Sequence, residues 1–104
     1  MTFNTELGIK DVAITTEFMQ QYCDADKRVR RAVDKMCRLM LDSGRFPNSF
    51  NAHPAFMLKG VAIGWITCSA GYWRVLFTFE EGVVEMFWLG TKSDTLTELG
   101  RLQQ

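Results

Sequence analysis

The chain has 104 residues, and its 12 lysines and arginines balance 12 aspartates and glutamates, so it carries no net charge. A chain of this length forms one domain with one modest core; residues 1–104 are interpreted as that domain, with residues 1–11 and 97–104 as irregular tails. The zero net charge gives no indication of a polyanionic partner. No apolar run reaches the ~20 residues of a membrane span, and the first ten residues lack the layout of a secretory signal. We therefore expect a cytoplasmic protein with no membrane partner.

Cysteine usage argues against disulfides and metal. Cys23, Cys37 and Cys68 are odd in number and far apart, which is typical of reduced thiols in a cytosolic protein. Together with His53, the single histidine, they lack the short chelating pairs of zinc sites. No metal and no cofactor are expected, and His53 itself is interpreted as a surface or structural residue.

The first half of the chain predicts a strand and two helices. Residues 12–15 alternate weakly, and Thr15 or Thr16 can cap a short helix that ends near Cys23. A second helix of about 17 residues, or roughly 25 Å, begins after Asp24 or Asp26. The glycine and proline at positions 44 and 47 end it. We expect the two helices to form an antiparallel hairpin. The buried stripe of the second helix has 3–4 spacing and contains Val29, Val33, Met36 and Met40.

A basic segment is hidden by the overall neutrality. Residues 26–45 hold seven basic side chains against three acidic ones. Four of the basic side chains share the outer face of the second helix: Lys27, Arg31, Lys35 and Arg38. A solvated outer face explains them, since any such helix must be charged there. Contact with nucleic acid is the alternative.

The second half of the chain predicts a three-stranded antiparallel meander. Residues 45–60 are interpreted as a connector with two prolines, and apolar, β-branched and aromatic runs follow at 61–69, 72–79 and 83–90. Two-residue turns at Ala70-Gly71 and Glu81-Gly82 separate these runs. Asp94 can cap a short helix at the end of the chain, with leucines at positions 96, 99 and 102.

The turns fix a register. Ala62 is expected opposite Phe79, Gly64 opposite Phe77, Ile66 opposite Val75 and Cys68 opposite Trp73, with Val84, Met86 and Trp88 joining this core face. On the other face, Trp65, Leu76 and Phe87 form an apolar row beside Arg74. We expect this second face to be partly exposed and to bind a partner. Cover by the C-terminal tail or by a second copy, as a homodimer, is the alternative.

Short motifs in the meander resemble the RelE/ParE toxin superfamily. Gly71-Tyr72-Trp73-Arg74 and the apolar residues after it are similar to the family's central strand, with a tryptophan inserted between tyrosine and arginine. Leu58-Lys59-Gly60 is similar to the segment before the meander, and Thr91-Lys92 to the basic end of the last strand. The resemblance covers about residues 12–96. It implies an α+β fold of order β-α-α-β-β-β, with the helix hairpin on one face of a small antiparallel sheet.

The resemblance also implies a function. Members of this family are toxins that cleave messenger RNA on the ribosome and are held inactive by an antitoxin protein. Arg74 matches the strand arginine that would hold the phosphate, and Lys92 the basic residue that would add positive charge. Tyr72, Lys59 and Trp65 would contact substrate, and Leu76 and Phe87 a partner protein.

The chain departs from the family at several positions. Trp65 and Thr67 stand where active members carry basic residues, and Leu96 lies near the place of a tail tyrosine. These departures favour a second hypothesis, a non-catalytic binding module of the same fold or a gyrase-directed inhibitor. An unrelated α+β domain is a third. Arg74 also has another interpretation, as a partner of Glu85 or Thr67 on the same face.

Overall fold

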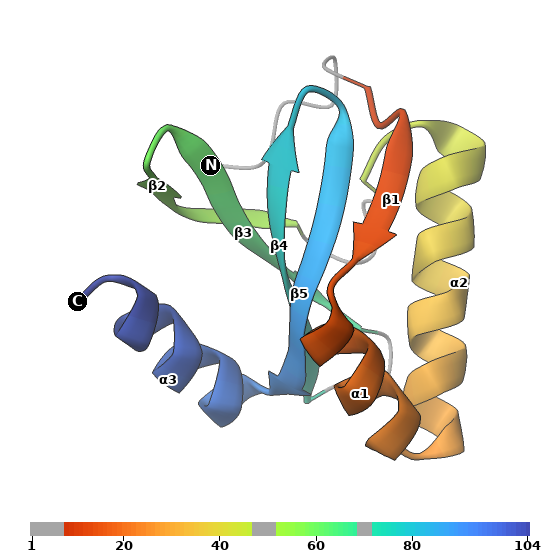
Figure 1. The fold of residues 1–104 in the computed structure, drawn as a ribbon. Helices are drawn as coiled ribbons and strands as arrows, with labels where there is room; N and C mark the ends of the chain where they lie inside the picture. The colour runs from red at the N-terminus through yellow and green to blue at the C-terminus, as the bar shows by residue number, and fades with distance from the viewer. Residues whose placement is uncertain (1–7, 47–51, 69–71) are drawn as a thin grey trace.

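The computed structural model describes residues 8–46, 52–68 and 72–104. Two helices lie against one face of a five-stranded sheet, and a third helix lies on the other side (Figure 1). In chain order the elements are β1 (Asp11–Ile14), α1 (Thr16–Asp24), α2 (Lys27–Ser43), β2 (His53–Leu58), β3 (Val61–Thr67), β4 (Trp73–Glu80), β5 (Val83–Thr91) and α3 (Lys92–Leu102).

The sheet has the strand order β1-β5-β4-β3-β2. The expected α+β architecture with a helix hairpin on the sheet is confirmed, but the sheet is mixed, since β1 runs parallel to β5. The register predicted between β3 and β4 is also confirmed, from Ala62 opposite Phe79 to Ile66 opposite Val75. Glu81 and Gly82 form the expected turn, with φ angles of 50° and 82°. The other predicted turn, at residues 70 and 71, lies outside the described residues.

Strand β2 was not expected, because residues 45–60 were interpreted as a connector. It pairs antiparallel with β3 through a turn at Lys59 and Gly60, whose φ angles of 52° and 83° are typical of a two-residue hairpin. Pro54 is tolerated because β2 is an edge strand and its register shifts between Pro54 and Phe56.

Local capping signals define the helix ends. The Thr15 hydroxyl accepts a hydrogen bond from the Phe18 amide, and the Asp26 carboxylate accepts one from the Val29 amide. Gly44, at a φ of 69°, ends α2 as predicted. The helix expected at the end of the chain is present, but its N-cap is Thr91 rather than Asp94. It runs to Leu102, as the leucine spacing indicates, so residues 97–102 are not part of an irregular tail.

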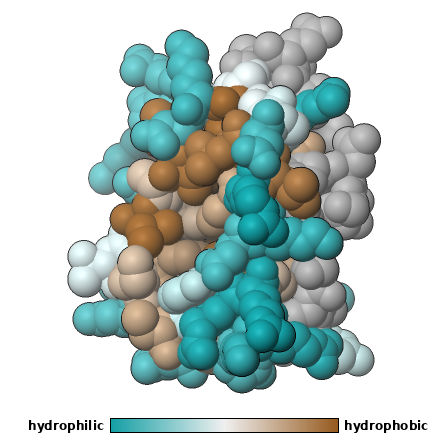
Figure 2. Space-filling view, turned by 90° about the vertical axis from the view of Figure 1, so that its right-hand side faces the viewer, coloured by the Kyte–Doolittle hydropathy of each residue, from teal (hydrophilic) through white to brown (hydrophobic). Residues whose placement is uncertain are grey.

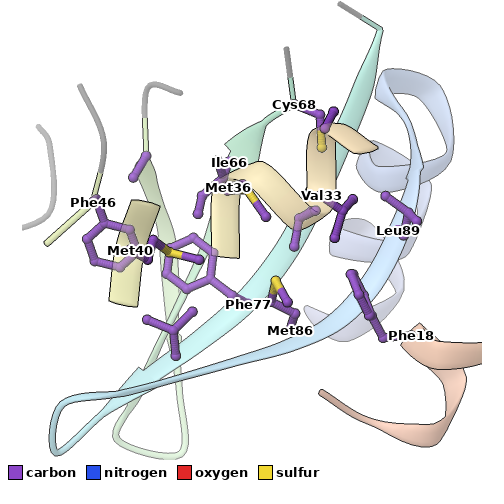
Figure 3. Packing of buried hydrophobic residues seen from close by; sticks show 14 of the residues in the cluster. Phe18, Val33, Met36, Met40, Phe46, Ile66, Cys68, Phe77, Met86 and Leu89 are labelled. Atoms are coloured by element: carbon purple, nitrogen blue, oxygen red, sulfur yellow. The ribbon is translucent and has the colours of Figure 1, made fainter. Parts of the chain in front are cut away.

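The main core lies between the helix hairpin and the sheet (Figure 3). The predicted stripe of α2 is buried, and Met36 and Met40 have no exposed surface. Phe18 of α1 is 1% exposed. Phe77 of β4 is also fully buried, and its ring centroid lies 5.1 Å from that of Phe46. This is the core face that the alternation predicted.

A β-bulge in β5 changes part of that pattern. Leu76 pairs with Trp88 and Phe77 with Met86, so Phe87 is an extra residue without a partner in β4. Beyond it the faces exchange. Trp88 was expected in the core but lies on the second face. Leu89 was expected on the second face but lies in the core, where it is 3% exposed.

The second face is partly exposed, as expected, and α3 covers its centre: Trp65 and Phe87 are half-buried and Glu85 is exposed. Leu76 is fully buried and Ile63 is 3% exposed, and both belong to one hydrophobic cluster with Leu99 of α3. We call these three residues and the side chains that pack on them the second cluster. Of the covers considered for this face, the chain's own C-terminal segment is the one observed. The packed side chains are Phe56, Leu58, Trp65, Phe87 and Trp88.

Candidate functional site

Arg74 lies at the end of the sheet where β5 finishes and α3 begins. It pairs with Thr67 of β3 on one side and with Gly90 of β5 on the other. Tyr72, just before β4, is 81% exposed, and its carbonyl accepts a hydrogen bond of 2.9 Å from the amide of Lys92. The structure therefore brings Arg74, Tyr72 and the exposed Lys92 to one end of the sheet.

The guanidinium of Arg74 rests on the indole of Trp65. Its Cζ atom lies 3.9 Å from the ring centroid, a cation–π distance worth about 0.5–2 kcal/mol depending on solvent exposure. Partial burial lowers the pKa of Arg74, but an arginine keeps its charge throughout the neutral range. Trp65 thus holds the cation in place without neutralising it.

His53 occupies the other side of the same indole. It pairs with Trp65 across β2 and β3, and the two rings stack with centroids 4.4 Å apart and planes 30° apart. Because β2 and β4 flank β3 on opposite sides, His53 and Arg74 approach Trp65 from opposite sides. This position differs from the expected one, since the sequence pattern predicts a connector at His53. Lys59-Gly60 was the available signal, since a hairpin there makes the preceding residues a strand.

Arg74 has no polar partner in the described part of the chain. Within these residues, the ion pair that forms is between Arg101 and Glu98 of α3. Glu85, considered as a partner of Arg74, pairs in register with Thr78, farther along β4. Thr67 lies opposite Arg74 without a hydrogen bond between the side chains. No described residue therefore accepts a hydrogen bond from the five N–H donors of the guanidinium.

Gly90, which pairs with Arg74 in register, makes room for the start of α3. A Cβ atom there would lie 3.0 Å from Cβ of Asp94 and 3.4 Å from Nε1 of Trp88. The start of α3 and the indole of Trp88 therefore occupy the space that a side chain would take. Trp88 Nε1 is buried and has no hydrogen-bond partner within the described residues.

The remaining predicted site residues lie elsewhere. Lys59 is exposed in the turn between β2 and β3, six residues along β3 from the level of Arg74, or ~20 Å at the rise of a strand. Leu76 is buried, so it offers no surface to a partner in this conformation, and Phe87 is partly buried in the second cluster. The structure thus groups Arg74, Trp65, Tyr72 and Lys92, and separates them from Lys59.

A second feature is an apolar groove on the side of the molecule formed by β1, α1 and α2. Ile14 and Met19 on its rim are 41% and 44% exposed. Figure 2 shows apolar side chains gathered beside a hydrophilic column on this side of the molecule. β1 is also an edge of the sheet, with backbone groups unpaired on its outer side. The groove is lined by Ile14, Phe18, Met19, Tyr22, Val33, Asp34, Cys37 and Met86.

The polar groups of this groove are few. The hydroxyl of Tyr22 donates a 2.7 Å hydrogen bond to Asp34, and that bond, with burial, raises the pKa of Tyr22. Burial raises the pKa of the Cys37 thiol to about 11.

Among residues 8–46, 52–68 and 72–104, no three histidine, cysteine or acidic side chains come together as metal ligands. Within the same ranges, no helix combines the length and hydropathy needed to cross a membrane.

Comparison with known proteins gives one informative likeness. The sequence matches no protein-family model and no curated protein. Among solved structures, it superposes on a chain of the archaeal RelE–RelB complex from Pyrococcus horikoshii OT3 with a TM-score of 0.65. The fold is RelE-like. The superposition covers 79% of this chain and 93% of the other at 12% sequence identity. The RelE-like architecture inferred from the short motifs of the meander is thereby confirmed.

Proposed function

We propose that this chain is the toxin of a toxin–antitoxin pair and that it binds single-stranded messenger RNA at Arg74 and cleaves it. One observation carries the proposal. A charged guanidinium is held over an indole, partly buried, with no carboxylate partner among the described residues. An arginine fixed in this way is suited to bidentate binding of a phosphate. The RelE-like fold is consistent with this use.

The reaction needs few groups. The ribose 2′-oxygen attacks the neighbouring phosphorus, the bond to the 5′-oxygen breaks, and the products are a 2′,3′-cyclic phosphate and a 5′-hydroxyl. The proton leaves the 2′-hydroxyl and one is supplied to the 5′-oxygen. Arg74 would stabilise the charge on the nonbridging oxygens, and the ammonium of Lys92 would add positive charge at the same end of the sheet. Tyr72, which is 81% exposed, is placed to contact the RNA.

Cleavage of an mRNA by the purified protein, with and without ribosomes, tests the proposal. We expect Arg74→Ala to lower the rate about 100-fold or more, the usual cost of removing one group that stabilises developing charge. Arg31→Ala is the matched control, because Arg31 is exposed on the outer face of α2, and it should cleave as the wild type does. Equal rates for wild type and Arg74→Ala would exclude Arg74 from catalysis. Loss of activity in Arg31→Ala would instead implicate the basic face of α2.

We also propose that an antitoxin covers the apolar groove beside β1. The exposed rim of the groove and the open edge of β1 suit an amphipathic segment of a partner, and the similar solved structure is a RelE–RelB complex. Met19→Asp on the rim should then prevent co-purification with the product of a neighbouring gene. Met57→Asp is the control, since Met57 is 64% exposed on β2 at the opposite edge of the sheet. A stable complex with no RNA cleavage under any condition would favour a non-catalytic binding module.

A further inference from the structure

We infer that His53 is a second phosphate-binding group, active when protonated, and that His53 and Arg74 hold neighbouring phosphates of one RNA strand on the two sides of Trp65. The inference rests on the proposed function, because it adds a contact to the same RNA at the same site. It concerns binding, however, and can be tested without cleavage.

The geometry of the three side chains carries this inference. Trp65 stands on the central one of three strands, and each neighbouring strand brings one nitrogen-rich group onto its indole. The imidazole lies 4.4 Å from the indole on the β2 side, and the guanidinium 3.9 Å from it on the β4 side. Both groups are partly exposed. The stack therefore presents two potential cations at a separation fixed by the ring between them.

The intervening indole decides which role His53 can have. In the cleavage reaction, the attacking 2′-oxygen must reach bonding distance of the phosphorus. A base for that oxygen must therefore lie beside the phosphate that Arg74 holds. Trp65 stands between His53 and Arg74, so His53 cannot occupy that place. With the indole between them, the two groups are better placed to bind two separate phosphates than to share one. The next anionic group along an RNA strand is the phosphate one nucleotide away, and this is the group that His53 would bind.

The charges around His53 leave it free for a ligand. β3 carries no charged residue, and His53 is the one titratable side chain of β2. Arg74 faces it from β4 across the indole. On α3, Lys92 and Asp94 lie in the first turn, and Glu98 is engaged by Arg101. On β5, Glu85 lies toward the far end, opposite Thr78. No hydrogen bond or ion pair joins His53 to any of them in the described chain.

The sign of the pH dependence follows from this arrangement. An imidazole ordinarily gains its proton near pH 6.5. A phosphate beside it stabilises the protonated form, so RNA binding takes up a proton and becomes tighter as the pH falls through this range. Arg74 keeps its charge over the same range and provides the contact that remains at higher pH.

Equilibrium binding of an uncleavable 2′-O-methyl oligonucleotide at pH 5.5 and pH 8.0 tests the inference. At fixed salt, the wild type should bind roughly three- to fivefold more tightly at pH 5.5, the size expected for one partly exposed ionic contact. The dependence of the logarithm of affinity on the logarithm of salt concentration should steepen by about 0.7, because one further phosphate is neutralised on a single strand.

Two variants make the result specific. His53→Gln should bind at both pH values as the wild type does at pH 8.0, whereas His53→Lys should bind at both as the wild type does at pH 5.5. Circular dichroism confirms that each variant is folded. If wild type and His53→Gln respond equally to pH, or if the wild-type salt slope is the same at both pH values, the inference is wrong.

The two proposals fail in different ways. Proton-linked binding without cleavage would leave His53 as a phosphate-binding group and refute the endonuclease. Cleavage that depends on Arg74, together with binding that does not respond to pH, would refute the role of His53 alone. Absence of oligonucleotide binding at both pH values would refute both.

Discussion

The docking of α3 on the second face of the sheet predicts a large difference between two leucines of that helix. Leu99 is 9% exposed and belongs to the same hydrophobic cluster as the buried residues Ile63 and Leu76, whereas Leu96, three residues earlier, is 53% exposed. Substituting either leucine with alanine changes helix propensity by the same small amount. The difference in stability between Leu99→Ala and Leu96→Ala therefore isolates the burial of α3 against the sheet.

The magnitude follows from burial. A buried leucine replaced by alanine costs about 2–5 kcal/mol, made up of lost transfer free energy and the remaining cavity. Leu99 belongs to a small cluster at the margin of the sheet, where the helix can settle toward the space, so we expect the lower part of this range, about 2–3 kcal/mol. For Leu96→Ala we expect less than about 0.5 kcal/mol. A domain of this size has only about 5–15 kcal/mol of stability in total, so the first change is substantial.

Urea denaturation followed by circular dichroism and tryptophan fluorescence measures both variants. With a slope of about 1.5 kcal/mol per molar urea, Leu99→Ala should lower the midpoint by about 1.5–2 M. Leu96→Ala should lower it by less than about 0.3 M. Equal midpoints for the two variants would refute the docking of α3 as described. An unchanged midpoint with faster hydrogen exchange confined to α3 would show that the helix opens separately from the sheet.

Three further outcomes are expected. Gly90→Ala should lower the free energy of unfolding by about 1–3 kcal/mol, because its Cβ would crowd side chains 3.0 and 3.4 Å away. Gly100→Ala in α3 should instead raise it by about 0.5–1 kcal/mol in thermal unfolding, because the added Cβ would meet no atom within 4 Å beyond the neighbouring backbone of its own helix. Mass spectrometry after iodoacetamide at pH 8 should find label on the exposed Cys23 first. Cys37 and Cys68 should be protected, since burial raises their thiol pKa values to about 11 and about 12.

Elements defined by short-range signals could be predicted from the sequence. Thr15 and Gly44 act through their own backbone and side-chain geometry, so they mark helix ends wherever the fold places them. The turn at Glu81 and Gly82 fixes the pairing of the flanking residues in the same local way, and the β4–β5 register holds until the bulge. These signals were enough to indicate the order of elements and the RelE-like architecture.

Features that depend on distant residues were missed. The position of α3 on the sheet follows from the clustering of Leu99 with Ile63 and Leu76, which lie far away in the sequence. Strand β2 was hidden by Pro54 and by a register shift that ordinary alternation does not show. The spacing of apolar residues describes a face of one element, but it does not say which other element covers that face.

The candidate site shows the same division. Arg74 was found because a motif surrounds it, and Trp65 because it breaks the basic pattern expected on β3. The stacking of Arg74 on Trp65 could not be predicted from the sequence. Arg74 pairs with Thr67, so it reaches Trp65 only diagonally across β3 and β4. His53 was missed as a neighbour because its strand was missed.

The bulge in β5 connects the covered face with the site. If Phe87 paired with Leu76 in an unbroken register, Leu89 would lie opposite Arg74, and Trp88 would lie opposite Val75 in the main core. With it, Leu89 fills the core, Trp88 joins the second cluster, and Gly90 stands opposite Arg74. A glycine at that position admits the first turn of α3 and adds no side chain beside the guanidinium. The bulge at Phe87 therefore has two effects on the second face: α3 can pack on its centre, and Arg74 stays accessible at its end.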